Sequence, residues 1–88
     1  MINISIEVIG KVQGVGFRYY ILEHAKELGL KGYVKNLANG NVYIEAEGEP
    51  NNIERLKHYC EQGPVRARVS RCIYESNVLR FFKDFCIK

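Results

Sequence analysis

The chain has 88 residues, of which 47% are hydrophobic and 26% charged, and its formal net charge is +3. A chain of this length forms one small domain, so we expect residues 1–88 to fold as a single unit. The mild positive charge favours anionic ligands without demanding a nucleic acid. No apolar run approaches the roughly 20 residues that cross a bilayer, which argues against a membrane partner.

The cysteines indicate the compartment. Cys60, Cys72 and Cys86 are odd in number, far apart and without Cys-x-x-Cys spacing. This pattern is typical of reduced, partly buried thiols in a cytoplasmic protein. The N-terminus has no basic segment leading into an apolar one, so no signal peptide is expected.

The first quarter of the chain predicts a strand followed by a helix. Isoleucine and valine alternate with polar residues over residues 2–8, which indicates a strand buried on one face. Apolar residues then recur at helical spacing from Phe17 to Leu28, and Gly29 is well placed to end that helix.

Two further strands are expected around Tyr33-Val34 and over residues 42–46. Asn39-Gly40 lies between them and favours a tight hairpin of type I′. A helix follows Pro50, with Asn51 and Glu54 in the spacing of a capping box.

Gly63-Pro64 ends the second helix, and a fourth strand begins at Ala67. Ser76-Asn77 suggests a turn, and a last short strand is expected at Phe85–Ile87. The order strand–helix–strand–strand–helix–strand predicts an α+β fold of ferredoxin-like type. This is a two-layer α/β sandwich with an antiparallel sheet, both helices on one face and a short extra C-terminal strand.

The loop between the first strand and the first helix carries the clearest chemical signal. Gly14 and Gly16 let backbone N–H groups turn inward together, which forms an anion-binding concavity. The helix that follows points its positive end at the same place, and Arg18 adds a planar cationic fork. Because the first two strands run in the same direction, Asn36 near the end of the second should lie close to this loop. The sequence therefore predicts a phosphate site.

Two longer motifs resemble the signatures of the acylphosphatase family. Residues 8–18 read VIGKVQGVGFR and residues 32–42 read GYVKNLANGNV. Gly63-Pro64 and the closing residues 85–88 resemble further family features. The resemblance covers essentially the whole chain.

This resemblance implies hydrolysis of small acyl phosphates to a carboxylate and inorganic phosphate by a monomeric enzyme. Asn36 would orient the attacking water, and no metal or organic cofactor would be needed. By position, the phosphoryl group would be held by Arg18 and by the loop amides of Gln13, Gly14, Val15, Gly16, Phe17 and Arg18. Three positions depart from the family pattern, where threonine, aspartate and glutamate are more usual: Ile21, Asn39 and Tyr43.

Other readings of the same residues remain open. The first is a non-catalytic acylphosphatase-like domain of the kind that heads larger maturation enzymes. The second is an RNA-binding module, because Lys31-Gly32-Tyr33-Val34 resembles part of an RNA-recognition signature. That signature belongs on a central strand, whereas here it falls on the second strand, expected at an edge. No specific nucleic acid is therefore expected as a partner.

Overall fold

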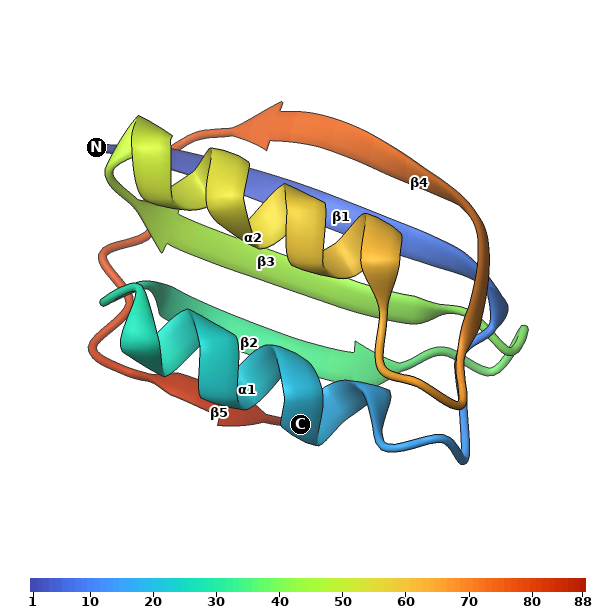
Figure 1. Cartoon of the computed structure of the whole chain (residues 1–88). Coiled ribbons are helices and arrows are strands. Elements are labelled where there is room, and N and C mark those ends of the chain that lie inside the picture. The colour runs from blue at the N-terminus through green and yellow to red at the C-terminus, as the bar shows by residue number, and fades with distance from the viewer.

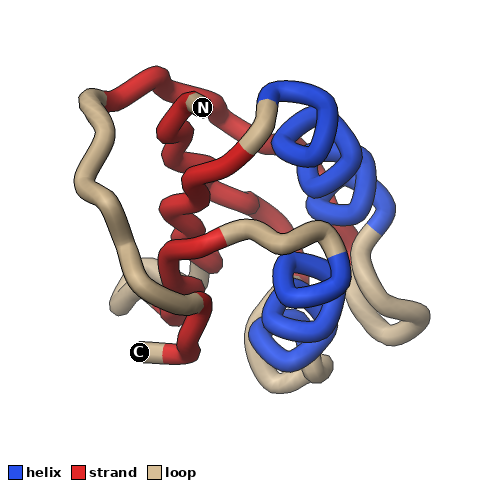
Figure 2. The backbone as a smooth tube through the Cα atoms, turned by 90° about the vertical axis from the view of Figure 1, so that its left-hand side faces the viewer, coloured by secondary structure: helices blue, strands red, loops and turns tan.

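A computed structural model describes residues 1–88, in which two helices lie side by side on one face of a five-stranded sheet (Figure 1). In the side view, the helices form one layer and the strands the other (Figure 2). The predicted ferredoxin-like α+β fold is confirmed. In chain order the elements are β1 (Ile2–Lys11), α1 (Phe17–Glu27), β2 (Lys31–Asn36), β3 (Val42–Gly48), α2 (Pro50–Gln62), β4 (Arg68–Asn77) and β5 (Phe85–Ile87).

The strand order across the sheet is β4-β1-β3-β2-β5. β1 and β2 both pair antiparallel with β3, and they therefore run in the same direction. β4 is antiparallel to β1, whereas β5 is parallel to β2, so the complete sheet is mixed. Because β5 covers the outer side of β2, the expectation that β2 is an edge strand was wrong.

The core fills the space between the sheet and the helices. It contains 17 buried hydrophobic residues. α1 contributes Phe17, Ile21 and Ala25, and the periodicity that predicted this helix is the periodicity of its buried face. Ile21 has no exposed surface, so the departure from threonine places an additional apolar side chain in the core. Neither helix is long and apolar enough to span a membrane.

Two local predictions about turns were wrong in detail. The link between β2 and β3 spans residues 37–41, and Gly40 is the only residue in it with positive φ, at 95°. A type I′ turn requires positive φ at both central residues, so it is excluded. Instead the Asn39 side chain accepts a hydrogen bond from the Asn41 N–H at 3.0 Å. The expected turn at Ser76-Asn77 is also absent, since both residues continue β4 in register with β1.

The capping box expected in α2 does not form. The N-cap is Glu49, and it makes no side-chain capping bond. Pro50 explains this, because its fixed φ suits the first helical position and shifts the start of the helix ahead of Asn51. Glu54 instead pairs with Lys57 at 3.0 Å along the exposed helix surface.

A buried carboxylate fastens the C-terminal segment to the sheet face opposite the helices. Glu47 of β3 is 1% exposed and accepts hydrogen bonds from the backbone N–H groups of Arg80, Phe81 and Phe82. The Asn3 amide donates to it as well, at 2.9 Å. Figure 2 shows the loop after β4 crossing this face. Burial raises the pKa of Glu47, but these hydrogen bonds outweigh burial and leave the pKa below its ordinary value.

We expect Glu47→Gln to lower the free energy of unfolding by about 2 kcal/mol at neutral pH, because hydrogen bonds to a charged acceptor are lost. Because the pKa is lower in the folded state, the stabilisation is present above the unfolded value of 4.5 and disappears as the pH falls through the folded value. Urea unfolding from about pH 7 to about pH 3 checks this. The variant should lose less stability on acidification than the wild type. Glu49→Gln, on an exposed side chain, is the control; an equal effect from both variants would contradict the prediction.

Candidate active site

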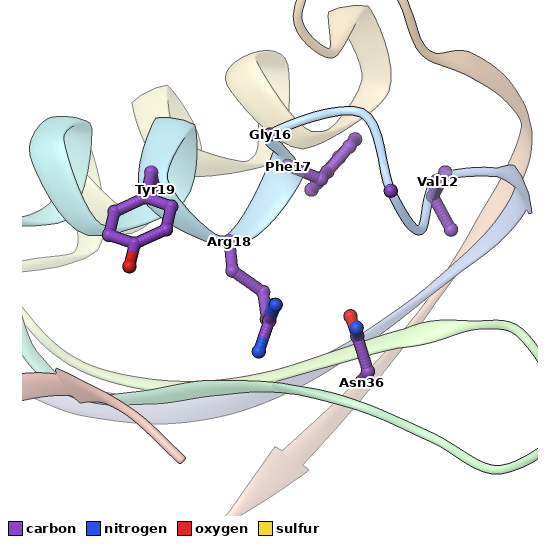
Figure 3. A pocket seen from close by; sticks show the side chains of 7 residues that line it. Val12, Gly16, Phe17, Arg18, Tyr19 and Asn36 are labelled. Atoms are coloured by element: carbon purple, nitrogen blue, oxygen red, sulfur yellow. The ribbon is translucent and has the colours of Figure 1, made fainter.

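A cavity of about 140 Å³ opens between the start of α1 and the end of β2. Figure 3 shows the side chains of Arg18 and Asn36 directed into the same space from opposite walls. The residues that line it are Val12, Gly14, Gly16, Phe17, Arg18, Tyr19 and Asn36. The loop and the residue at the end of β2 therefore meet, as the sequence predicts.

The wall formed by the loop offers hydrogen-bond donors. Gly14 and Gly16 have φ of 74° and 81°, which let the chain turn from β1 into α1. Gly16 is the N-cap of α1 and has no side chain to satisfy the first helical N–H groups. Within the chain, the backbone N–H groups of residues 13–19 have no hydrogen-bond acceptor. An anion in the cavity would satisfy donors that the fold leaves free.

Arg18 supplies the positive charge. It lies in the first turn of α1, half-buried, and takes part in none of the ion pairs of the chain. A guanidinium without a carboxylate partner keeps its donors available for a planar, doubly bonded contact to a phosphoryl group. The positive end of α1 adds to its field.

Asn36, the last residue of β2, faces the cavity with an unpartnered acceptor. Its Oδ1 atom is buried and has no hydrogen-bond partner. A buried carbonyl oxygen without a donor costs roughly 1–3 kcal/mol, so such an atom signals a group that it normally binds. A water molecule or a ligand hydroxyl fits that requirement.

Two residues of the predicted binding loop do not line the cavity. Val15 is buried in the core at 7% exposure. Gln13 directs its side chain to the β2–β3 link, where its Nε2 atom donates to the carbonyls of Leu37 and Asn41 at 2.8 and 2.9 Å. Tyr19, by contrast, was not among the predicted site residues and lies at the cavity with 65% of its surface exposed. Its position directly after Arg18, in the first turn of the predicted helix, is the sequence feature that could have placed Tyr19 at the cavity.

The other chemically active side chains lie elsewhere. Burial raises the pKa of the Cys60 thiol well above its usual value, which keeps it protonated and unreactive. His24 stacks on Tyr59 with ring centroids 3.6 Å apart, in a surface cluster between the helices. Nowhere do three His, Cys, Asp or Glu side chains gather in an arrangement that holds a metal ion.

Comparisons with known proteins show the family to which the chain is similar. A family model described as acylphosphatase matches residues 4–87. An acylphosphatase from Thermotoga petrophila is 44% identical over 85 residues, which cover 97% of this chain and 94% of the relative. The crystal structure of acylphosphatase from Bacillus subtilis matches with a TM-score of 0.97 and 34% identity, over 100% of this chain and 99% of that one.

A longer protein is also similar. The crystal structure of full-length HypF, in the phosphate- and nucleotide-bound form, matches with a TM-score of 0.89 and 30% identity. The match covers 99% of this chain but 12% of that one. Relatives of matching length are acylphosphatases, so the accessory-domain alternative and the RNA-binding alternative are not favoured.

Fold and site together define an α+β fold in which a glycine-rich loop and the N-terminus of a helix line one cavity. The chain belongs to the acylphosphatase family, and it is a hydrolase of that family.

The loop geometry predicts a selective effect of Gly16→Ala. An alanine at positive φ is strained, so the free energy of unfolding should fall by about 1 kcal/mol. Relief of that strain moves the loop amides, and the affinity for inorganic phosphate should fall several-fold in calorimetric titration. Gly29→Ala is a matched control, because Gly29 has φ of 68°, equally open surroundings and a place at the other end of α1. Equal phosphate affinities in the two variants would contradict the role of the loop.

Proposed function

We propose that this enzyme hydrolyses small acyl phosphates in the cavity between α1 and β2, with the phosphoryl group held by Arg18 and the loop amides. The amides are those of residues 13–18, and the products are a carboxylate and inorganic phosphate. The observation that carries the proposal is the unpartnered Asn36 Oδ1 in the same cavity as an unpaired guanidinium. The guanidinium suits an anion, and the Asn36 oxygen suits a neutral nucleophile such as water.

The proposed step is an in-line displacement at phosphorus. Asn36 Oδ1 accepts a hydrogen bond from water, whose oxygen then bonds to phosphorus while the bond from phosphorus to the acyl oxygen breaks. The departing electron pair stays on the carboxylate, and the proton of the water passes to a phosphoryl oxygen of the substrate. The transition state needs mainly position and charge stabilisation, which an amide nest, one arginine and one asparagine supply.

This reaction does not require a general acid. The leaving carboxylate has a conjugate acid with a pKa of about 4 to 5, so it departs as a stable anion at neutral pH. That chemistry suits a cavity whose lining contains no His, Asp, Glu or Cys. The proposed mechanism uses no metal and no cofactor.

We further propose that residues 1–88 act as one domain, as a monomer and in the cytoplasm. The proposed step needs only Arg18, Asn36 and the loop amides, and no residue of a second chain, which suits a monomeric enzyme. The three cysteines are free thiols, as a reducing compartment maintains them.

The direct test is release of inorganic phosphate from acetyl phosphate and benzoyl phosphate in the presence of a chelator. We expect turnover of both, well above hydrolysis in buffer alone. Purified, folded protein that gives no rate above buffer would refute the proposed function, and a rate abolished by the chelator would refute the metal-free mechanism.

Two substitutions test the division of roles. Arg18→Ala should weaken inorganic phosphate binding and lower kcat/KM by about 10²-fold or more, because charge stabilisation is lost. Asn36→Ala should lower kcat by a similar factor and leave phosphate affinity nearly unchanged, because it acts on the water. Arg71→Ala and Asn51→Ala, both at exposed positions, serve as controls. A folded Asn36→Ala variant that no longer binds phosphate would show that the assigned roles are wrong.

A further inference from the structure

The side chain of Gln13 connects the two halves of the proposed site. Its Nε2 atom donates to the Leu37 carbonyl at 2.8 Å and to the Asn41 carbonyl at 2.9 Å. A carboxamide nitrogen has two N–H donors, so both are used on the β2–β3 link. Gln13 precedes Gly14 of the loop, and Leu37 follows Asn36.

No other hydrogen bond joins these two segments. The hydrogen bonds between residues 12–16 and residues 36–41 are those two alone. Beyond the sheet that positions both segments, the distance from the loop amides to the Asn36 side chain therefore depends on one carboxamide and on packing.

The two acceptor carbonyls are also held in place by hydrogen bonds that do not involve Gln13. The Asn41 carbonyl accepts from the Leu37 N–H at 2.8 Å, and the Leu37 carbonyl accepts from the Gly40 N–H at 3.1 Å. Asn41 is anchored in turn to Glu7 of β1 through its side-chain amide, at 2.6 Å. Each carbonyl oxygen has a second lone pair, which Gln13 takes. The link keeps its own hydrogen bonds without Gln13, so removing that side chain frees the loop to shift without unfolding the link.

We infer that Gln13 is a positioning residue, whose side chain fixes the phosphate loop relative to Asn36 and thereby sets the rate of the hydrolytic step. The inference rests on the proposed roles of Arg18 and Asn36. The loop amides and Arg18 lie on one continuous segment, so we expect their contacts with phosphate to survive removal of the carboxamide. The in-line approach of water held by Asn36 does depend on it, since a displacement of about 1 Å can cost on the order of 10²-fold in rate.

Gln13→Met tests the connection by removing both donors at nearly constant volume. We expect kcat with acetyl phosphate to fall at least about tenfold, while the Kd for inorganic phosphate changes less than about twofold. Unfolding by urea establishes that the variant is folded at the assay temperature. Gln13→Asn keeps the amide but is one methylene shorter, and it should lose kcat in the same selective way.

Gln13→Glu gives a reversible test through pH. The ionised carboxyl has no donor and faces two carbonyl oxygens, so kcat at neutral pH should fall at least as far as in Gln13→Met. The protonated carboxyl has one O–H donor and restores one of the two hydrogen bonds. The ratio of variant to wild-type kcat should therefore rise several-fold between about pH 8 and about pH 5, because the carbonyls raise the pKa of the introduced group.

The charged groups around position 13 are present in both proteins. They include Glu7, which accepts a hydrogen bond from Asn41 of the link, and Lys11 and Arg18, which lie near position 13 in the sequence. Any effect that they have on the wild-type rate is divided out in the ratio of variant to wild type. Gln62→Glu adds the same charge at an exposed position on α2. The ratio of its kcat to the wild-type kcat should not change between about pH 8 and about pH 5.

Each outcome decides between alternatives. Wild-type kcat in Gln13→Met, a parallel loss of phosphate affinity, or no recovery of Gln13→Glu in acid would overturn the inference and leave the proposed function intact. A wild type without acyl phosphate hydrolysis would overturn both. Selective loss of kcat in Gln13→Met, together with acid recovery of Gln13→Glu alone, would establish the positioning role.

Discussion

The site depends on the pairing of β1 and β2 to opposite sides of β3. Both pairings are antiparallel, so β1 and β2 run in the same direction and end at the same end of the sheet. The loop that leaves β1 and the Asn36 side chain at the end of β2 then face one cavity. Neither segment is near the other in sequence. A one-residue slip in the β2–β3 register would move Asn36 to the other face of the sheet and leave the loop without its partner.

The main polar stabilising contacts and the proposed chemistry lie at opposite ends of the central strand, β3. At the cavity end, the turn into α1 uses glycines at positive φ and leaves N–H groups and the Asn36 acceptor without partners. The buried Asn36 acceptor, and any of these N–H groups that water does not reach, reduce the stability of the fold. At the other end, Glu47 pairs across from Asn3 and satisfies three backbone donors of the C-terminal segment. The core beneath the helices adds the larger, non-directional contribution. A site with unsatisfied donors is tolerated because it is small and because stability is supplied elsewhere.

The features predicted from sequence were those with a local cause. Alternation at residues 2–8 and the helical spacing after Phe17 reflect burial on one face, and glycines followed by a helix start produce the concavity. Two of the wrong predictions, the turn at Ser76-Asn77 and the edge position of β2, concerned features that long-range contacts decide. The type I′ turn and the capping box were instead decided locally, by Asn39 and by Pro50. Ser76-Asn77 continues β4 because β1 lies beside it, and the Glu47 contacts require backbone groups more than 30 residues away. The sequence alone also could not show that the Gln13 side chain bonds to the β2–β3 link and does not line the cavity.

A hydrolysis that needs no general acid depends strongly on position. The carboxylate leaves without a general acid. The protein therefore needs to supply only positive charge near the phosphoryl group and a water molecule aligned for attack on phosphorus. The β1–α1 loop and the end of β2, which are proposed to carry these groups and meet only in space, must then be held at a fixed separation. Two hydrogen bonds from one carboxamide to fixed carbonyls restrict direction as well as distance, which non-directional packing contacts alone do not. For this chemistry, a residue that sets the separation can matter as much as residues that touch the substrate.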